Sequence, residues 1–524
     1  MRKHLAFGSL FAIAAAMAFA PYAISAAEWR LPPCARIEGD MLVVDVPPGD
    51  PGRFDEGYAH CELDVDLSPY FESGRGAVAR VRVRARDISK PDRNWNGVKF
   101  MFRYMSEDGR MQWPGYQFPL GSFDWRTAET RVNWLAPYGL PKDGKATLIL
   151  GLQGCTGHAE FDLSTLEFTS EDIGIPRVNE DFIVRYPASD AAHRRGTMLP
   201  GRDTTEDDIE TLHQWGATMA RFQIARNWHK VDDNRDLAEY GAWVDRRLDN
   251  LANVLEWAKA RGMKICVDLH ALPGGKHGER PGQPQEMAMF TEDEYADAFI
   301  DTWRRIATRF KGHPALYGYD LVNEPTQRRP VKHNYWELQR RAAEAIREID
   351  PDTPIVFAAN LASRADAFRY LSPIAMDNVI YQAHVYIPGI YTHQGVNSQP
   401  FSTSKRPLTW PGVDPVSGEV WNKDWLRRNL QPIRDFQARH GCRIYVGEFS
   451  AAAWAPGAEN YLRDAIELFE EYGWDWTYHA FRESPIWDVD KEAPEGVASP
   501  KSKDMVPAKK ETARKRVLLE GFRK

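Results

Sequence analysis

Leu316-Tyr-Gly-Tyr-Asp-Leu-Val-Asn-Glu is a short apolar segment that ends in an amide and a carboxylate. Apolar residues recur with helical spacing on both sides of it, over residues 292–310 and 335–349. A buried strand between two amphipathic helices is the building unit of a parallel α/β sheet. We therefore expect this segment to be one strand of such a sheet, with its polar residues at the carboxyl end.

The same strand and helix unit repeats along residues 190–490. Helical spacing recurs over residues 206–215 and 243–261, and apolar strands are expected to begin at Gly196, Thr218, Lys264, Leu316, Pro354, Val379, Arg443 and Asp475. Eight such units predict an α/β fold of the closed (β/α)8 TIM barrel type. A doubly wound open sheet is the alternative that the same pattern allows.

Residues 28–175 have a different pattern. Short runs such as Ala77-Val-Ala-Arg-Val-Arg-Val-Arg-Ala alternate apolar and polar residues, and Gly, Pro, Asp and Asn separate the runs. Many short alternating strands with turn residues between them are typical of an all-β sandwich. The sequence therefore predicts an N-terminal jelly-roll sandwich domain before the barrel.

The two ends of the chain differ from both domains. Residues 1–27 begin with positive charge, continue through an apolar run over residues 5–20 and finish in small residues, which is the layout of a secretory signal peptide. An N-terminal anchor helix is the alternative. We expect an exported protein, periplasmic or secreted, with no stable membrane insertion after the signal is removed. Residues 491–524 are interpreted as a basic linker and a terminal helix.

Composition limits the kinds of partner. The chain has 524 residues, with 67 Lys and Arg against 74 Asp and Glu, and its net charge of −7 disfavours nucleic acid as a partner because phosphates would be repelled. The five cysteines include no C-x-x-C pair, so neither a metal cluster nor a redox motif is expected, and their pairing is open. No cofactor is implied, and the oligomeric state is open.

Polar residues gather where the predicted strands end, which is where barrels of this kind carry their active sites. These residues are Arg221, His270, Asn323, Glu324, His384, Tyr386, Glu448 and His479. Taken singly, each is better explained as an ion-paired or buried structural group, but together they favour a site. Glu324 and Glu448 end the fourth and seventh strands, and two carboxylates roughly 5–5.5 Å apart can cleave a glycosidic bond with retention.

Five segments resemble the motifs of glycoside hydrolase family 5, the cellulase-type retaining enzymes. They are, in chain order, Ala220-Arg-Phe-Gln-Ile, Asp268-Leu-His-Ala-Leu-Pro-Gly, Tyr319-Asp-Leu-Val-Asn-Glu-Pro, His384-Val-Tyr and Tyr445-Val-Gly-Glu-Phe. The resemblance implies that Glu324 is the acid/base and Glu448 the nucleophile. It further implies that the nucleophile and its sugar are surrounded by Arg221, Asn323, His384 and Tyr386, with His270 lining the same cleft.

One position departs from that family. Its eighth strand often ends in a tryptophan that forms the floor under the sugar, but His479 stands at this position here. Trp476 or Trp487 is the candidate replacement. A smaller polar floor would stack less strongly on a sugar and could contact a substituent by a hydrogen bond.

The sandwich also carries a resemblance. Leu150-Gly-Leu-Gln-Gly-Cys-Thr-Gly-His-Ala-Glu-Phe-Asp resembles the last strands of jelly-roll carbohydrate-binding modules. Trp95, Trp113, Trp125 and Trp134 are candidates to stack on sugar rings, and packing in the core or against the barrel is the alternative for each.

These observations predict an exported retaining glycoside hydrolase that cleaves β-linked glucan-type or related polysaccharide with two glutamates. A poly- or oligosaccharide is the expected partner. A non-catalytic carbohydrate-binding protein and a transglycosylase on the same fold are the alternatives, and the choice between endo and exo action is open.

Overall fold

The computed structural model describes residues 28–49, 58–91, 93, 95–107, 109–135, 139–178, 180–187, 192–226, 234–275, 287–396, 407–415, 417–494 and 502–524. The predicted signal peptide lies outside these residues. Within them, no helix is both long enough and apolar enough to cross a membrane. The chain divides into two compact units, one formed by residues 1–134 and 138–172 and the other by residues 135–137 and 173–524.

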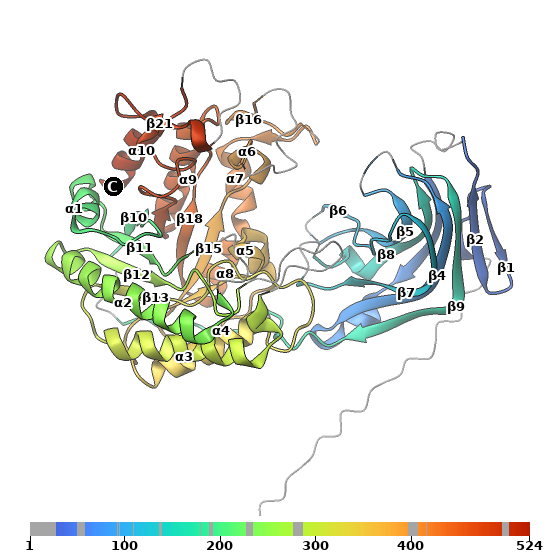
Figure 1. The fold of residues 1–524 in the computed structure, drawn as a ribbon, viewed down its shortest axis with the longest axis horizontal. Helices are drawn as coiled ribbons and strands as arrows, with labels where there is room; N and C mark the ends of the chain where they lie inside the picture. The colour runs from blue at the N-terminus through green and yellow to red at the C-terminus, as the bar shows by residue number, and fades with distance from the viewer. Residues whose placement is uncertain are drawn as a thin grey trace, which may run out of the picture. The chain divides into compact units, whose positions relative to one another are not determined.

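The first unit contains two antiparallel sheets, as an all-β sandwich requires (Figure 1). The five-stranded sheet has the order β1 (Ala35–Glu38), β2 (Met41–Val46), β9 (Gly157–Glu171), β4 (Gly76–Ile88) and β7 (Gly121–Val132). The four-stranded sheet has the order β3 (Tyr58–Asp66), β8 (Lys145–Gln153), β5 (Gly97–Met105) and β6 (Met111–Gln112). In β4, Val81 and Val83 are fully buried while Arg82 is exposed, so the period-two pattern defines an inner and an outer face.

The second unit is a closed barrel of eight parallel strands, which confirms the predicted TIM barrel and excludes an open sheet (Figure 1). In barrel order the strands are β10 (Arg195–Met198), β11 (Met219–Gln223), β12 (Lys264–Asp268), β13 (Leu316–Asp320), β14 (Ile355–Ala358), β15 (Val379–Val385), β18 (Arg443–Phe449) and β19 (Asp475–Tyr478). Each predicted strand is present, and most differ from expectation only by a residue or two at an end.

Helices connect and cover the strands. They are α1 (Glu206–Trp215), α2 (Leu237–Ala260), α3 (Asp293–Phe310), α4 (Tyr335–Arg347), the short turns α5 (Asn360–Ser363) and α6 (Gly389–Thr392), α7 (Lys423–Asn429), α8 (Gln431–His440), α9 (Ala458–Tyr472) and α10 (Ala513–Phe522). Local chemistry sets their ends. The side chains of Thr205 and Asp208 form a capping box that starts α1, and Gly216 ends it at a φ of 94°.

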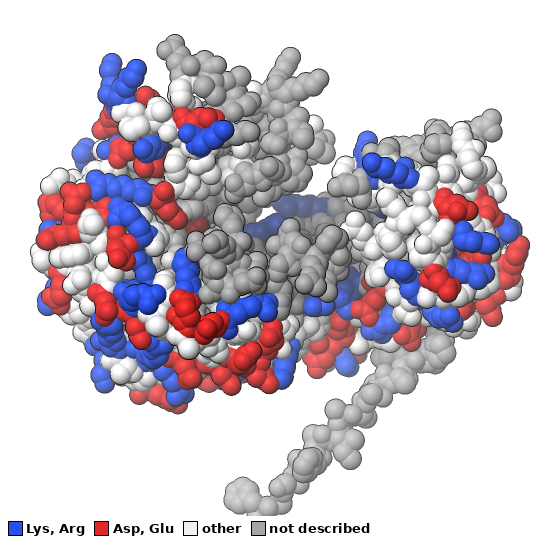
Figure 2. Space-filling model, viewed as in Figure 1, with Lys and Arg blue, Asp and Glu red and all other residues white. Residues whose placement is uncertain are grey.

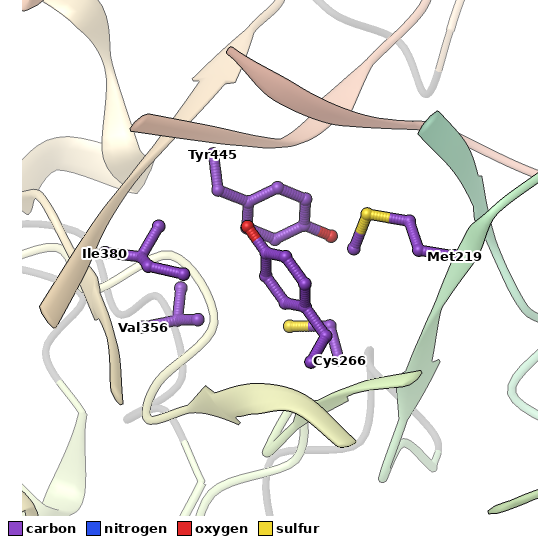
Figure 3. Packing of buried hydrophobic residues seen from close by; sticks show 6 residues of the cluster. Met219, Cys266, Val356, Ile380 and Tyr445 are labelled. Atoms are coloured by element: carbon purple, nitrogen blue, oxygen red, sulfur yellow. The ribbon is translucent and has the colours of Figure 1, made fainter. Parts of the chain in front are cut away.

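The barrel interior is packed with side chains. Met219, Cys266, Val356, Ile380 and Tyr445 point toward one another from different strands (Figure 3). Met219, Cys266 and Tyr445 each lie two or three positions before a polar residue at the carboxyl end of the same strand. This apolar layer therefore forms a solid base beneath the strand ends, as in other barrels of this type.

The outer helices carry mixed charge. Arg309 of α3 lies 2.6 Å from Asp249 of α2, and Arg305 pairs with Asp245 one turn earlier. Figure 2 shows both signs interspersed over the face formed by α2, α3 and α4. Pairing of this kind on exposed helices contributes little to stability, typically 0–1 kcal/mol for each pair.

Two segments pack more closely than the sequence suggests. In the long loop after β15, Trp410 and Trp421 are buried, and the Trp410 indole donates to Asp464 of α9 at 2.8 Å. The predicted terminal helix is α10, which packs against α9 and buries Phe522 on Trp476. Its Arg514 is also buried and donates to three backbone carbonyls, so not all of its basic residues lie on a solvated face.

Candidate active site

The centre of the site is Arg221 of β11, whose side chain is completely buried. Its guanidinium donates to Asp320 at 2.8 Å and to Glu448 at 2.7 Å, and it lies 3.0 Å from an oxygen of Asp268. Burial alone would lower the pKa of Arg221, but the three carboxylates outweigh burial and raise it well above its usual value. Arg221 is therefore a permanent cation at the junction of strands β11, β12, β13 and β18.

A second set of contacts fixes the carboxylates around this cation. The Gln382 amide donates to Asp320 at 2.6 Å, and burial nonetheless raises the pKa of Asp320 to about 6. Nδ1 of His270 lies 2.8 Å from Asp268, and Nε2 lies 3.2 Å from the Asn323 amide nitrogen. Because a carboxylate only accepts and an amide nitrogen only donates, His270 carries its proton on Nδ1 and accepts at Nε2.

Gly447 is required by the packing of its neighbours. A Cβ at this position would lie 2.3 Å from Nε2 of Gln382 and 3.1 Å from Nε2 of His384. The register between β15 and β18 also shifts by one residue here, so that His384 pairs with Glu448. The bare backbone at Gly447 thus allows Gln382, His384 and Glu448 to share one end of the barrel.

Glu448 is the more deeply enclosed of the two glutamates, with a side chain only 6% exposed. One oxygen accepts from Arg221 and the other accepts from the Tyr386 hydroxyl at 2.9 Å. Burial would raise the pKa of Glu448, but the charges of His384, His479 and Arg221 outweigh it and hold this pKa well below its usual range. Glu448 is therefore an ionised carboxylate at neutral pH.

Glu324 faces the same gap from the segment that follows β13. Its backbone is left-handed, with a φ of 48°, a conformation that costs a non-glycine residue about 1–3 kcal/mol and is found mainly at functional sites. Its side chain is 22% exposed and lies 3.0 Å from Nδ1 of His384. One carboxylate oxygen of Glu324, one of Glu448 and a ring nitrogen of His384 all lie within 4.8 Å of one another.

Within the described part of the chain, these three side chains also bring their donor atoms close enough together to hold a metal ion. Arg221 already binds Glu448 at 2.7 Å, however, and a metal on the same carboxylate would face the guanidinium charge. The arrangement fits two carboxylates with a shared histidine better than it fits a cation site.

A relay of hydrogen bonds lies on the other side of Glu448. Nδ1 of His479 is 2.5 Å from the Tyr386 hydroxyl, and Nε2 is 3.2 Å from Glu483. Burial would lower the pKa of His479, but Glu448 and Glu483 outweigh burial and raise it. Burial and the charge of Glu448 raise the pKa of Tyr386 well above its usual value. A protonated His479 donates from both nitrogens, so the Tyr386 hydroxyl proton is directed to Glu448.

The structure removes Trp476 from the predicted site. Its ring is fully buried, stacks on Phe522 and donates to Glu470 of α9 at 2.8 Å, so it lies between the barrel wall and the helices. The reason is strand geometry, because successive side chains of β19 alternate between inside and outside, and His479, which directly follows the strand, takes the inner face. Trp487 is the aromatic residue near the floor, with its ring centroid 5.8 Å from that of His479.

The other predicted residues come together at one end of the barrel. These are Arg221, His270, Asn323, Glu324, His384, Tyr386, Glu448 and His479, which hydrogen bonds and ion pairs link to one another. Sequence reasoning missed Asp268, Asp320, Gln382 and Glu483 as parts of this network. Asp268 and Asp320 did carry a signal, since each is an acid within an otherwise apolar strand.

Comparison with known proteins identifies the family. The family Cellulase (glycosyl hydrolase family 5) matches residues 188–484, so the chain belongs to that family, and it is a glycosidase that hydrolyses O-glycosyl bonds. The chain is 26% identical over 297 residues to Endoglucanase C of Acetivibrio thermocellus, across 52% of this chain and 83% of that protein. It is 29% identical over 245 residues to Cellodextrinase A of Ruminococcus flavefaciens, across 47% and 68% of the two chains.

A solved structure described as a glycoside hydrolase shares the fold. It has a TM-score of 0.50 and 22% sequence identity, across 63% of this chain and 99% of that one.

Removal of the buried cation tests the electrostatic centre. Arg221→Met leaves Asp320 and Glu448 without their counter-charge, and we expect the free energy of unfolding to fall by about 3–5 kcal/mol at pH 8. Without the cation, the pKa of a buried carboxyl such as Asp320 rises further above its unfolded value. Its ionisation then destabilises the fold as pH rises through the folded pKa, so the deficit should be smaller at pH 5. Urea denaturation at both pH values measures this.

The control for this experiment is Arg364→Met, which removes a surface guanidinium paired with Asp366. It should change the free energy of unfolding by less than about 1 kcal/mol at either pH. A deficit for Arg221→Met that is the same at pH 5 and pH 8 would contradict the electrostatic explanation.

Proposed function

We propose that this chain hydrolyses β-linked glucan chains with retention of anomeric configuration, with Glu448 as nucleophile and Glu324 as acid/base. The observation that carries the proposal is the approach of the two carboxylates to within 4.8 Å at their nearest oxygens. Retaining enzymes hold these groups about 5–5.5 Å apart, whereas inverting enzymes need about 6.5–9.5 Å to admit a water between them.

In the first step, a carboxylate oxygen of Glu448 attacks the anomeric carbon of the sugar. The bond from that carbon to the glycosidic oxygen breaks, and Glu324 gives its proton to the departing oxygen. The products are a glycosyl ester on Glu448 and a released sugar with a free hydroxyl. The lowered pKa of Glu448 keeps it ionised for the attack, and Arg221 and Tyr386 orient its two oxygens.

In the second step, the Glu324 carboxylate removes a proton from a water molecule. The water oxygen attacks the anomeric carbon from the face that the leaving group vacated, and the ester bond to Glu448 breaks. Glu448 returns to its ionised form and Glu324 to its protonated form, so the cycle closes with two inversions and net retention.

The substrate is proposed from the relatives and from the site. Relatives over the barrel are described as an endoglucanase and a cellodextrinase, which supports a β-glucan. We assign Asn323 and His270 to hydrogen bonds with the bound sugar, and His479 to a polar floor in place of a stacking ring. Binding without catalysis is disfavoured because both carboxylates are present in reacting geometry. Export stays a prediction from residues 1–27, and so does the absence of a nucleic-acid partner.

The nucleophile assignment predicts a specific chemical rescue. Glu448→Ala should lower kcat on barley β-glucan by at least about 10⁴-fold, because no covalent intermediate can form. Added azide should restore turnover of an activated aryl β-cellobioside and give the α-glycosyl azide, because azide occupies the space of the missing carboxylate. NMR of the product identifies its anomeric configuration.

Glu471→Gln, which changes a surface glutamate on α9, is the matched control and should keep full activity. Rescue that yields a β-glycosyl azide, or an alanine variant that remains active without azide, would refute the role of Glu448. With acceptor sugars added, the ratio of hydrolysis to transfer products separates a hydrolase from a transglycosylase.

The acid role of Glu324 predicts dependence on the leaving group. Glu324→Gln should slow the cleavage of unactivated cellooligosaccharides by about 10²–10⁴-fold, because the departing oxygen needs a proton. A dinitrophenyl β-cellobioside, whose leaving group needs no proton, should form the intermediate at nearly the native rate. Pre-steady-state release of dinitrophenol is the measurement, and an equal loss on both substrates would count against this role.

The relay from Glu483 predicts a change in pH dependence. The anion of Glu483 helps to raise the pKa of His479, so Glu483→Gln should lower that pKa. His479 would then lose its proton at a lower pH, and its bare Nδ1 would compete with Glu448 for the Tyr386 proton. We expect the basic limb of kcat/KM against pH to move to lower pH, with the acidic limb unchanged. Basic limbs that coincide in native and variant enzyme would exclude this coupling.

A further inference from the structure

A groove of about 1480 Å³ lies on the four-stranded sheet of the first unit, far along the chain from every residue of the active site. Its walls come from β3, β5 and β8 and from the segments next to β5 and β6. The lining combines aromatic rings with cationic side chains. Neither the family match, which covers residues 188–484, nor the proposed reaction gives this groove a role.

Two tryptophans in the lining are exposed. Trp95 is 62% exposed and Trp113 is 49% exposed, and both line the groove. The other three tryptophans of the sandwich do not line the groove, and Trp29 is buried. Trp134 is buried and donates to the carbonyl of Gly74, and Trp125 is half-buried under two guanidinium groups from β4. Each groove ring has one guanidinium near it, that of Arg93 at 5.5 Å from Trp95 and that of Arg103 at 5.8 Å from Trp113. Exposed flat rings in a groove are the side chains on which sugar rings stack.

The charged part of the lining is positive. Arg103 is neutralised by Glu62, with two contacts of 2.8 and 2.9 Å. Lys90 and Lys99 also line the groove, and no carboxylate of a described residue forms an ion pair with either. Lys99 is half-buried and its ammonium donates to the backbone carbonyl of Trp95, beside the exposed ring.

Lys99 is partly buried and has no carboxylate partner among the described residues, so an added anion would stabilise its charge strongly. Burial lowers the pKa of Lys99 to about 8, so this side chain is still mostly protonated at neutral pH. A partly buried cation gains more from an ionised partner than an exposed one does, because less water screens the pair. The groove therefore offers a site for an anion next to a platform for a sugar ring.

We propose that this groove binds an acidic glycan, with sugar rings stacked on Trp95 and Trp113 and a carboxylate substituent paired with Lys99. The ligand class follows from the two features together, because stacking alone selects any sugar and the lysine alone selects any anion. The proposal does not depend on the catalytic assignment.

Carboxymethylcellulose and hydroxyethylcellulose provide the test, because they share a backbone and differ in the charge of the substituent. The full chain with Glu448→Gln, which prevents digestion, is run in native gels containing either polymer. We expect stronger retardation by carboxymethylcellulose. Lys99→Met should weaken that interaction by about tenfold, the effect of losing one charge-assisted contact, and leave retardation by hydroxyethylcellulose unchanged.

The control is Lys142→Met, which removes an exposed lysine of the same unit outside the groove and changes the net charge equally. It should bind carboxymethylcellulose like the parent protein. Trp95→Ala with Trp113→Ala should weaken binding of both polymers, and thermal melting checks that each variant is folded. Hydrolysis of an aryl β-cellobioside by the Lys99→Met chain with Glu448 intact should match the native rate.

Three results would overturn the proposal. Equal retardation by the two polymers would assign the groove to neutral glycans. Equal weakening by Lys99→Met and Lys142→Met would show a general charge effect with no built site. Carboxymethylcellulose binding that the double tryptophan substitution does not weaken would place the contact outside the groove.

Discussion

A buried arginine shared by three carboxylates is the constraint on which the site depends. An unpaired guanidinium inside a protein is costly, so Arg221 requires anions close by, and Asp268, Asp320 and Glu448 supply them from three other strands. The charges are satisfied only when these four strands bring their side chains together at one end of the barrel. The ion cluster therefore links the closure of the barrel to the position of Glu448.

The same cluster makes the environments of the two glutamates different. Glu448 is enclosed by cations and is held at both oxygens, by Arg221 and by Tyr386. Glu324 stands in a left-handed turn at the edge of the gap, with a more exposed carboxylate beside His384. Two carboxylates of equal chemistry acquire separate roles when their surroundings differ in this way. The proposed assignment of Glu448 as nucleophile and Glu324 as acid/base thus follows from the different surroundings of the two carboxylates.

Much of this arrangement could be predicted because short patterns determine it locally. Alternating helices and apolar strands are sufficient for the barrel, and the last polar residue of each strand identifies most of the site. Contacts between strands could not be predicted, because a single sequence does not say which partners face each other. Gln382 is an example, because no pattern in the sequence indicates that its amide donates to Asp320. Trp476 was a candidate for the floor, although its odd spacing from His479, the residue directly after β19, already separates the two side chains.

Gly447 has a consequence for how this sequence can vary. Its backbone angle is one that any residue adopts, and what forbids a side chain is the Gln382 amide 2.3 Å from the site of a Cβ. A larger residue at 447 requires a shorter one at 382, and a shorter residue there takes a hydrogen bond from Asp320 and so disturbs the partner of Arg221. A side chain at position 447 therefore has an effect that reaches Arg221, three contacts away, through Gln382 and Asp320.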